Sequence, residues 1–340
     1  MSETIKTAVI GAGASGLTAA ICAARRGEQT VVFEHKDRAG IKLSITGNGK
    51  CNFTNAYMSP ECFYSEKGSA VDAFLNRFGT EDALEFFDSL GIGYYCRNGY
   101  YYPESSKASD VVFKFVSECE KLNVQIKYNC EPDIQALISE FDKVILACGS
   151  RAHKETGSNG TGYKYLERLG IKYSRVLPAL CAVYCDDQDY FAEHKGERVI
   201  GTVEYDSHMA TGEIQITDYG LSGIPVFQLS RYISKDQDNA CLKKISVDFH
   251  PLPEDIPEFL RDRFDKNNSR KPILFSVIKT AGFNKSQVCT GGVPLESLTE
   301  NFELKEQPGV YVIGEMCDVD GICGGYNLHW AWLSGNLCGK

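Results

Sequence analysis

One short stretch of glycines near the start of the chain restricts the possible fold more than any other feature of the sequence. Residues 11–16 read Gly-Ala-Gly-Ala-Ser-Gly, and they lie between the β-branched run 5–10 and the alanine-rich run 15–26. Gly27 ends that second run, and a further apolar run, 30–33, is closed by Glu34. A strand, a glycine turn, a helix and a second strand within about 30 residues form a βαβ unit. In this context the glycine pattern indicates a dinucleotide site.

Each glycine of the pattern has a physical role in such a site. Gly11 permits the tight turn, and Gly13 has no side chain that would keep a diphosphate away from the backbone. Gly16 lets the helix pack closely against the strand. The helix start at Ala14 and Ser15 then offers unpaired N–H groups and a partial positive charge to an anion.

Glu34 indicates which dinucleotide is bound. A carboxylate at the end of the second strand accepts hydrogen bonds from a ribose 2′-hydroxyl and repels a 2′-phosphate. The sequence therefore predicts FAD or NAD and disfavours NADP as the bound dinucleotide. The alternative is a glycine turn that only packs, with no ligand.

Two later apolar runs also end in small or acidic residues. The run 144–147 leads into a small-residue turn, and the run 310–313 leads into glycines and carboxylates and then into a helix. Acids at such a strand end can hold the hydroxyls of a ribityl chain. Glycines before a helix can face the flavin edge where negative charge grows on reduction. The candidate cofactor contacts here are Ala147, Cys148, Gly149, Gly314, Glu315, Asp320, Gly325, Tyr326 and Asn327. An ordinary buried strand and an ordinary helix cap are the alternatives.

The remaining periodicity predicts helices and strands on both sides of a β-rich stretch. The expected helices are 72–90, 108–122, 160–169, 222–233, 253–265 and 327–337. The expected strands are 124–128, 143–148, 245–249 and 310–314, with an ordered loop over 41–55 and an antiparallel sheet over about 171–216. This order predicts an α/β fold in which a Rossmann-like FAD-binding domain, residues 1–175 and 288–340, is interrupted by an inserted β-rich substrate or cap domain, residues 176–287.

Composition narrows the partners. Hydrophobic residues make up 43% of the 340-residue chain and charged residues 24%, and no stretch approaches the roughly 20 apolar residues of a membrane span. The beginning of the chain lacks the features of a secretory signal, so we expect a cytoplasmic protein with no membrane partner. The net charge of −9 makes nucleic acid an unexpected partner, because an acidic surface repels phosphate backbones.

The 14 cysteines are the most unusual feature of the composition. No Cys-x-x-Cys pair occurs in the sequence, and disulfide frameworks belong mainly to small secreted chains. We expect free thiols, many of them packed as small hydrophobic groups, and no metal site.

Two longer motifs indicate a family. The stretch Gly47-Asn48-Gly49-Lys50-Cys51-Asn52-Phe53-Thr54-Asn55 and the stretch 324–335, Gly-Gly-Tyr-Asn-Leu-His-Trp-Ala-Trp-Leu-Ser-Gly, resemble signatures of the BaiN-like NAD(P)/FAD-dependent oxidoreductases. These proteins are also described as aminoacetone-oxidase-family FAD-binding proteins. Shorter matches between the two motifs follow the family's order, so the resemblance spans nearly the whole chain.

The resemblance implies FAD held by a fold of the two-dinucleotide-binding-domain flavoprotein type, with an inserted β-rich domain over the flavin. We count His35, Lys42, Gly47, Asn48, Gly49, Cys51 and Asn52 among the cofactor contacts, and we expect Asn52, Thr54 and Asn55 beside the ring. The chain departs from the family pattern at Lys50, where arginine is usual, at Cys148 and Ser150 of the Ala-Thr-Gly-Gly turn, and at His329, where glutamine is usual. The chain is also shorter than is usual in the family.

The catalytic residues are not identified by the sequence. His329, Cys51 and Lys50 are candidates. A helix-surface or packed histidine is the alternative for His329, and a structural cysteine is the alternative for Cys51. Tyr100, Tyr101 and Tyr102 line a substrate pocket or form a strand with mixed faces, and Trp330 and Trp332 are expected in the core.

The expected activity is that of an FAD-dependent reductase or dehydrogenase that acts on a small organic substrate, with NAD(P)H as the electron donor. No second Gly-x-Gly-x-x-Gly stands between a strand and a helix, so NAD(P)H would dock only transiently. An oxygen-using amine oxidase and a non-catalytic flavin redox sensor or electron carrier are the alternatives. The sequence does not indicate the oligomeric state.

Overall fold

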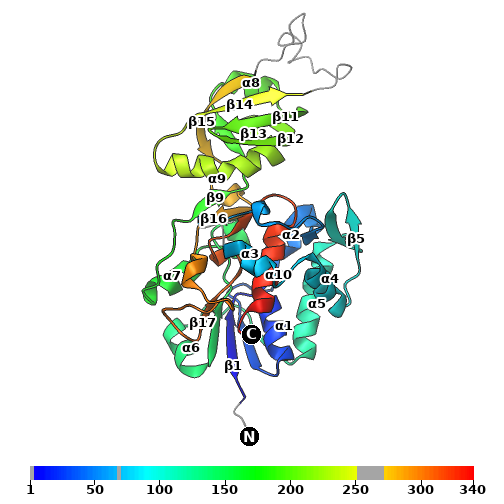
Figure 1. Ribbon diagram of the computed structural model, residues 1–340, viewed down its shortest axis with the longest axis vertical. Coiled ribbons are helices and arrows are strands. Elements are labelled where there is room, and N and C mark those ends of the chain that lie inside the picture. Colours follow the sequence, from blue (N-terminus) through cyan, green and yellow to red (C-terminus); the bar gives the residue numbers. More distant parts are fainter. Residues whose placement is uncertain (1–3, 67–69, 251–271) are drawn as a thin grey trace, which may run out of the picture. The chain divides into compact units, whose positions relative to one another are not determined.

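The computed structural model describes residues 4–66, 70–250 and 272–340. In it the chain divides into two compact units, which are described one at a time (Figure 1). The first unit consists of Met1–Val176 and Thr290–Lys340, and the second of Leu177–Cys289.

A five-stranded parallel sheet forms the centre of the first unit. Its spatial order is β17 (Val310–Val312), β8 (Lys143–Leu146), β1 (Lys6–Ile10), β2 (Gln29–Phe33) and β7 (Gln125–Lys127). The central strands are short runs of buried apolar residues, as expected for strands that are covered on both faces. This strand order is that of a Rossmann-type fold and confirms the predicted fold class.

Helices cover the sheet. α1 (Ala14–Arg25) packs against α5 (Ala108–Lys121) and against α10 (Tyr326–Leu337), and Figure 1 shows α1 and α10 side by side. The chain passes from β1 to β2 through α1, and from β7 back across the sheet to β8 through α6 (Ile134–Glu140). These two crossovers run in opposite directions along the strand order. Since such crossovers are right-handed, α6 covers the other face of the sheet. A further helix of this unit, α7 (Thr161–Arg168), follows β8.

Two predictions for the segment between β2 and α5, the loop over 41–55 and the helix over 72–90, differ from the structure. The expected loop over 41–55 begins with the helix α2 (Ile41–Gly49), which breaks at Thr46, where ψ is 145°, and continues through Gly47 and Asn48 with positive φ. Glycine and asparagine adopt that conformation at low cost, so the same residues that suggested a loop also end the helix.

The expected helix over 72–90 is two helices, α3 (Ala70–Leu75) and α4 (Thr80–Ser89). Gly79 is extended between them, and its N–H donates to Asp82 Oδ2 at 2.7 Å, which starts the second helix. The smaller elements around these helices are β3 (Thr54–Asn55), β4 (Phe63–Tyr64), β5 (Tyr94–Arg97), β6 (Tyr100–Pro103) and β18 (Asp320–Gly321).

The second unit contains a closed antiparallel barrel. Its strands are ordered β10 (Val183–Cys185), β13 (Gly220–Gly223), β12 (His208–Thr217), β11 (Arg198–Tyr205), β14 (Lys244–Phe249) and β15 (Ile273–Thr280). A two-stranded sheet of β9 (Leu177–Ala179) and β16 (Val288–Thr290) adjoins it, together with α8 (Gln188–Glu193) and α9 (Ile224–Asp238). The predicted helix over 222–233 thus starts two residues later and runs further, and the predicted helix over 253–265 lies outside the described residues.

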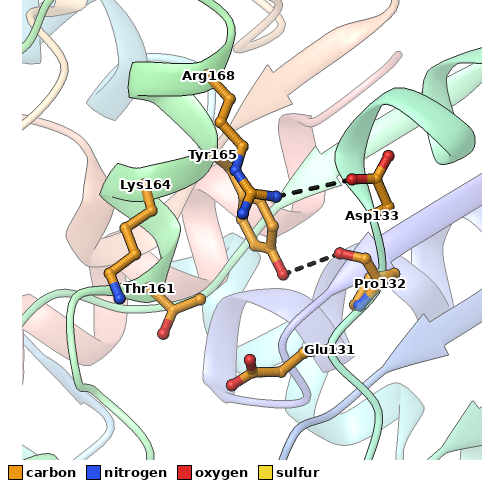
Figure 2. Close-up of a pocket in the computed structure, with 7 residues that line it drawn as sticks. All are labelled: Glu131, Pro132, Asp133, Thr161, Lys164, Tyr165 and Arg168. Atoms are coloured by element: carbon orange, nitrogen blue, oxygen red, sulfur yellow. Dashed lines mark hydrogen bonds and ion pairs between the residues drawn. The ribbon is translucent and has the colours of Figure 1, made fainter.

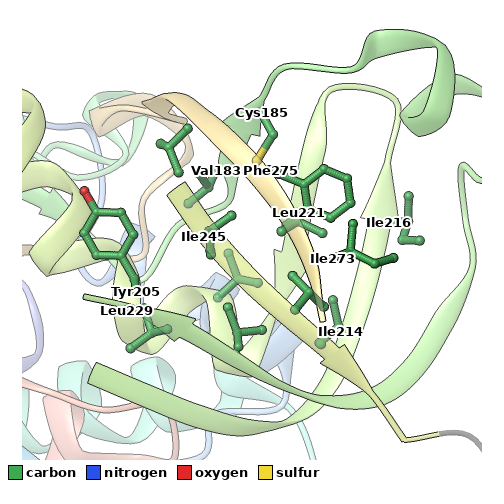
Figure 3. Packing of buried hydrophobic residues seen from close by; sticks show 14 of the residues in the cluster. Val183, Cys185, Tyr205, Ile214, Ile216, Leu221, Leu229, Ile245, Ile273 and Phe275 are labelled. Carbon is green, nitrogen blue, oxygen red and sulfur yellow. The ribbon is translucent and has the colours of Figure 1, made fainter. Parts of the chain in front are cut away.

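Apolar side chains fill the described interior of the barrel. Figure 3 shows Ile214, Ile216, Leu221 and Phe275 meeting inside it, and the first three of these are at most 1% exposed. Because this interior is a packed core, we infer that a ligand of this unit would bind on its outer surface or loops.

Candidate functional site

The glycine turn after β1 lies where the strand order of the sheet reverses, between β1 and β8. A methyl group on Gly11, whose φ is 107°, would lie 2.4 Å from the carbonyl oxygen of Ala147, and one on Gly16 would lie 1.9 Å from the carbonyl oxygen of Gly11. Both positions therefore require glycine for packing alone. Crevices at this point of a parallel sheet are where α/β folds bind their ligands.

Gly13 differs from its two neighbours in the motif. A methyl group there would meet no other atom within 4 Å, and Gly13 is the N-cap of α1 with no side chain capping the helix. The N–H groups of the first turn of a helix have no acceptor within the helix. Open space, uncapped N–H groups and the absence of acidic residues from this turn fit a diphosphate.

Glu34 is buried beside this turn, with 7% of its surface exposed. Its Oε2 accepts from the N–H of Ala12 at 2.8 Å, and its Oε1 accepts from the N–H of Lys36 at 2.9 Å. Because a carboxylate has about four acceptor sites, Glu34 can still accept hydrogen bonds from ribose hydroxyls.

His35 adds a second polar group at the same place. Its Nδ1 lies 3.3 Å from Glu34 Oε1, and its Nε2 is buried without a hydrogen-bond partner among the described residues. Gly157 lies next to the ring, since a methyl group there would be 3.1 Å from His35 Cε1. A buried polar atom without a partner fits a site that a polar ligand completes.

Residues from the end of the chain pack directly on the glycine turn. A methyl group on Gly314 would lie 2.4 Å from Ser15 Oγ, and one on Gly335 would lie 2.6 Å from the carbonyl oxygen of Ser15. Lys42 Nζ, in α2, binds Glu315 Oε2 at 2.7 Å. The structure therefore brings together the first and last predicted segments.

The two family-like motifs dock on each other through side-chain to backbone hydrogen bonds. With its amide oriented to suit its neighbours, Asn52 donates to the carbonyl oxygen of Thr54 at 3.0 Å and accepts from the N–H of Gly325 at 3.2 Å. Asn55 Nδ2 donates to the carbonyl oxygen of Gly324 at 3.0 Å. Trp332 Nε1 donates to the carbonyl oxygen of Phe53 at 2.9 Å.

The start of α10 is held from within its own loop. Asn327 accepts from the N–H of Gly321 at 2.9 Å and donates to its carbonyl oxygen at 3.0 Å. Gly325 is the N-cap of α10, with φ 93° and no side-chain cap on the helix. Asp320, in the neighbouring strand β18, is 1% exposed.

The structure gives His329 a structural position. It is fully buried, its Nδ1 lies 2.8 Å from Thr54 Oγ1, and its Nε2 lies 3.3 Å from the carbonyl oxygen of Phe78. Burial lowers the pKa of His329 from 6.5 to about 4, so the ring is neutral at pH 7. With both nitrogens engaged inside the protein, the ring is poorly placed to protonate a ligand.

The other two catalytic candidates occupy contrasting environments. Cys51 is buried, and burial raises the pKa of its thiol to about 12, which disfavours the reactive thiolate. Lys50 is exposed, as are Gly47 and Asn48, while Gly49 is half-buried.

The turn after β8 contains two further predicted cofactor contacts. Burial raises the pKa of the Cys148 thiol to about 12, and Gly149 faces Ser158.

Sequence reasoning missed two polar contacts that join the ends of the chain. Ser334 Oγ accepts from the N–H of Gly314 at 3.0 Å, and Trp330 Nε1 donates to the carbonyl oxygen of Gly314 at 3.2 Å. The available signal was a serine inside the otherwise apolar run 330–335. Trp330 and Trp332 are 2% and 0% exposed, which confirms their expected place in the core.

A pocket of about 320 Å³ lies elsewhere in the first unit, between α7 and the segment before α6 (Figure 2). Two contacts join its walls: Tyr165 donates to the carbonyl oxygen of Pro132 at 3.2 Å, and Arg168 lies 3.7 Å from Asp133. None of the predicted cofactor contacts lines it.

All 14 cysteines are free thiols. Within residues 4–66, 70–250 and 272–340, no three histidine, cysteine, aspartate or glutamate side chains are grouped as a metal site. No helix in the same ranges is both long enough and apolar enough to span a bilayer.

A parallel sheet of this order with an open glycine turn, a buried acid after the second strand and a closing C-terminal helix defines a dinucleotide-binding protein of the Rossmann type. Its family and relatives make it an FAD-dependent oxidoreductase. The chain belongs to the HI0933-like family, whose Rossmann-domain model matches residues 5–340. This confirms the family resemblance that the two long motifs indicate.

Two kinds of relative match the chain over nearly its full length. It is 35% identical to the 3-dehydro-bile acid delta(4,6)-reductase of Clostridium scindens in an alignment of 399 positions, gaps included. This alignment covers 98% of this chain and 97% of that protein. The chain is 26% identical to the ribosomal RNA dihydrouridine synthase of Escherichia coli, over 99% of this chain and 98% of that protein. Among solved structures, an open flavocytochrome c3 fumarate reductase matches with a TM-score of 0.50 at 12% identity, over 99% of this chain and 78% of that one, and this likeness concerns the fold alone.

The similarity to the ribosomal RNA dihydrouridine synthase removes the support for the prediction that nucleic acid is not a partner. A protein named for its action on ribosomal RNA is related to this chain along its whole length. The net charge of −9 therefore does not exclude nucleic acid as a partner for a protein of this family.

Proposed function

We propose that this protein is a reductase that adds hydrogen across a carbon–carbon double bond conjugated to a carbonyl group in a small organic substrate, with NAD(P)H as the donor. The observation that carries the proposal is the docking of the chain's two ends around the open turn at Gly13, since this arrangement suits one FAD. The 35% identity to a bile-acid reductase supports the direction of the reaction.

The names of the two relatives support a carbon–carbon double bond next to a carbonyl group as the bond that is reduced. A 3-dehydro-bile acid with double bonds at positions 4 and 6 is an extended unsaturated ketone, and dihydrouridine is uridine with one ring double bond saturated next to a carbonyl. A common reaction type on different substrates is expected when the cofactor supplies the chemistry and the protein the recognition. We favour the small unsaturated ketone because that relative is the more similar one.

Each end of the proposed FAD site has its own residues. The N–H groups at the start of α1 would hold the diphosphate, Glu34 and His35 the adenosine ribose, and Asp320 the ribityl chain. The N-terminus of α10, at Gly325 and Tyr326, would face the flavin edge that becomes negative on reduction. FAD bound there would accept a hydride from NAD(P)H and donate it to the substrate.

The chain's own part is to orient the cofactor and exclude water. Asn52 and Asn55 fix the turn at Gly324 and Gly325 through the hydrogen bonds described above. The contact between Thr54 and His329 holds the same turn from inside. We propose that Lys42, paired with Glu315, sets the local charge near the diphosphate.

Glu34 offers a direct test of the adenosine end. We expect Glu34→Gln to weaken FAD binding about tenfold, because a charge-assisted hydrogen bond to ribose becomes a neutral one. FAD titration of the apoprotein, followed by flavin fluorescence, measures the change. Asp37→Asn removes a nearby exposed charge and is the control. Equal affinity in both variants would contradict this role for Glu34.

Stopped-flow spectroscopy tests the proposed activity. We expect NADH or NADPH to bleach the flavin of the anaerobic holoenzyme, and a 3-oxo-4,6-diene bile acid to restore its colour without oxygen. Bleaching by amines with recovery only in oxygen would identify an amine oxidase instead. A flavin inert to all these compounds would identify a redox sensor or electron carrier.

We also propose a cytoplasmic location, since a chain with 14 free thiols suits a reducing compartment.

A further inference from the structure

The small sheet β3–β6–β5 has two chemically different faces. In its register Asn55 pairs with Tyr100 and Tyr95 pairs with Tyr102, so these four side chains lie on one face. Tyr101 lies on the other face, where its ring is 6.0 Å from that of Tyr94 in the aromatic core. The three consecutive tyrosines at 100–102 are therefore not equivalent.

The first face adjoins the turn that precedes α10. A methyl group on Gly324 would lie 3.1 Å from Tyr100 Cε1, 3.0 Å from Tyr326 Cε2 and 3.4 Å from Asn55 Nδ2. Gly324 has φ 134°, and its lack of a side chain lets the ring of Tyr100 rest against the turn. The ring of Tyr100 therefore contacts the residue that immediately precedes Gly325, the N-cap of the helix whose start the proposed function assigns to the flavin edge.

The hydroxyl groups of the tyrosines near this turn differ in their partners. Tyr326 is 5% exposed, and burial and the neighbouring Cys62 thiol raise the pKa of its hydroxyl, whereas Tyr57 donates to Glu61. Further along the hairpin, Tyr95 lies 2.9 Å from Ser106 Oγ. For the half-buried Tyr100, no hydrogen bond of the hydroxyl is found within the described part of the chain. Of the tyrosines that touch Gly324, Tyr100 is the one whose O–H is available to a ligand.

We propose that Tyr100 is the catalytic acid of the reduction, an inference that rests on the proposed function. A hydride supplied by bound, reduced FAD would form a bond to one carbon of the substrate's double bond, and the π electrons of that bond would take the proton of the Tyr100 hydroxyl onto the adjacent carbon. The two electrons come from NAD(P)H by way of the cofactor. Tyr100 is left as a phenolate and regains a proton from water, which its half-buried position permits.

The test compares Tyr100→Phe with Tyr101→Phe, which removes the same hydroxyl from the opposite face of the strand. Each holoenzyme is reduced with dithionite, so that the natural donor is not needed, and mixed anaerobically with a 3-oxo-4,6-diene bile acid. We expect reoxidation to slow on the order of 100-fold in Tyr100→Phe and to stay unchanged in Tyr101→Phe.

Four further measurements separate an acid from a structural residue. We expect the FAD content, the reoxidation by oxygen and the Kd of the bile acid for the oxidised enzyme, read from the shift of the flavin spectrum, to match the wild type in both variants. In D₂O, the wild type should place deuterium on one face of the protonated carbon, whereas Tyr100→Phe should give both faces.

The outcomes distinguish this inference from the proposed function. Fast, one-faced reduction by Tyr100→Phe would overturn the role of Tyr100 and leave the reductase proposal standing. A wild-type enzyme whose reduced flavin is not reoxidised by the bile acid would overturn both.

Discussion

Gly13→Asp should yield a folded protein that binds no FAD at micromolar concentration. The position is open, since a methyl group there meets no atom within 4 Å, and Gly13 already has the extended backbone of an N-cap residue. Aspartate is a favourable N-cap, so the fold should be as stable as before. A carboxylate about 4 Å from a bound phosphate costs on the order of 4 kcal/mol at the effective dielectric of a protein surface. That corresponds to FAD binding weaker by about 10³-fold.

The measurements are the flavin absorbance of the purified variant, an FAD titration and a thermal unfolding curve of the apoprotein. Gly13→Ala separates size from charge, and we expect it to lose less affinity than the aspartate variant. Gly16→Ala is the contrasting variant, because its methyl group would lie 1.9 Å from the carbonyl oxygen of Gly11 and should prevent correct folding. A yellow Gly13→Asp protein with unchanged affinity would refute the assignment of the diphosphate to this turn.

The second large effect concerns acid stability. Burial lowers the pKa of His329 from 6.5 to about 4 in the folded protein, whereas the unfolded chain keeps the ordinary value. As the pH falls from 6.5 towards 4, the unfolded state takes up a proton that the folded state does not. The free energy of unfolding therefore decreases in this window, by about 3 kcal/mol from this residue, and the full contribution is present above pH 6.5.

His329→Gln should remove this pH dependence. A glutamine amide can accept from Thr54 and donate to the carbonyl oxygen of Phe78, so stability at pH 7 should change by less than about 1 kcal/mol. Urea unfolding at several pH values measures the difference between the variant and the wild type. His208→Gln, which changes a half-buried histidine stacked on Tyr232, is the control for replacing a histidine by glutamine elsewhere in the chain. A loss of substrate reduction in His329→Gln at unchanged FAD content would mean that the ring takes part in proton transfer.

The sequence predicted those parts of the site that depend on local geometry. The turn at Gly11 and Gly16 is dictated by contacts that only glycine allows, and such contacts leave a clear pattern in the sequence. The acid Glu34 follows from its place at the end of a strand. The parallel sheet follows from the short apolar runs that alternate with helices.

The parts that were missed depend on contacts between distant segments. The sequence left a packed or a helix-surface position open for His329, because its burial results from the packing of α10 against the distant segment at Thr54 and Phe78. The break at Gly79 was missed since apolar spacing continues across it, while the bond to Asp82 that starts the second helix is a single side-chain contact. Closure of the barrel was not predicted either, because it depends on the pairing of β10 with β15.

The packing of α10 on the first glycine turn has a consequence for protein synthesis. A nascent chain that has not yet emerged as far as Gly335 lacks the surface that covers Ser15, however well its first βαβ unit has formed. Loading with the vitamin-derived cofactor should therefore follow translation of this helix and not accompany it. Ribosomes stalled before residue 326 should display chains that remain colourless in riboflavin-replete cells.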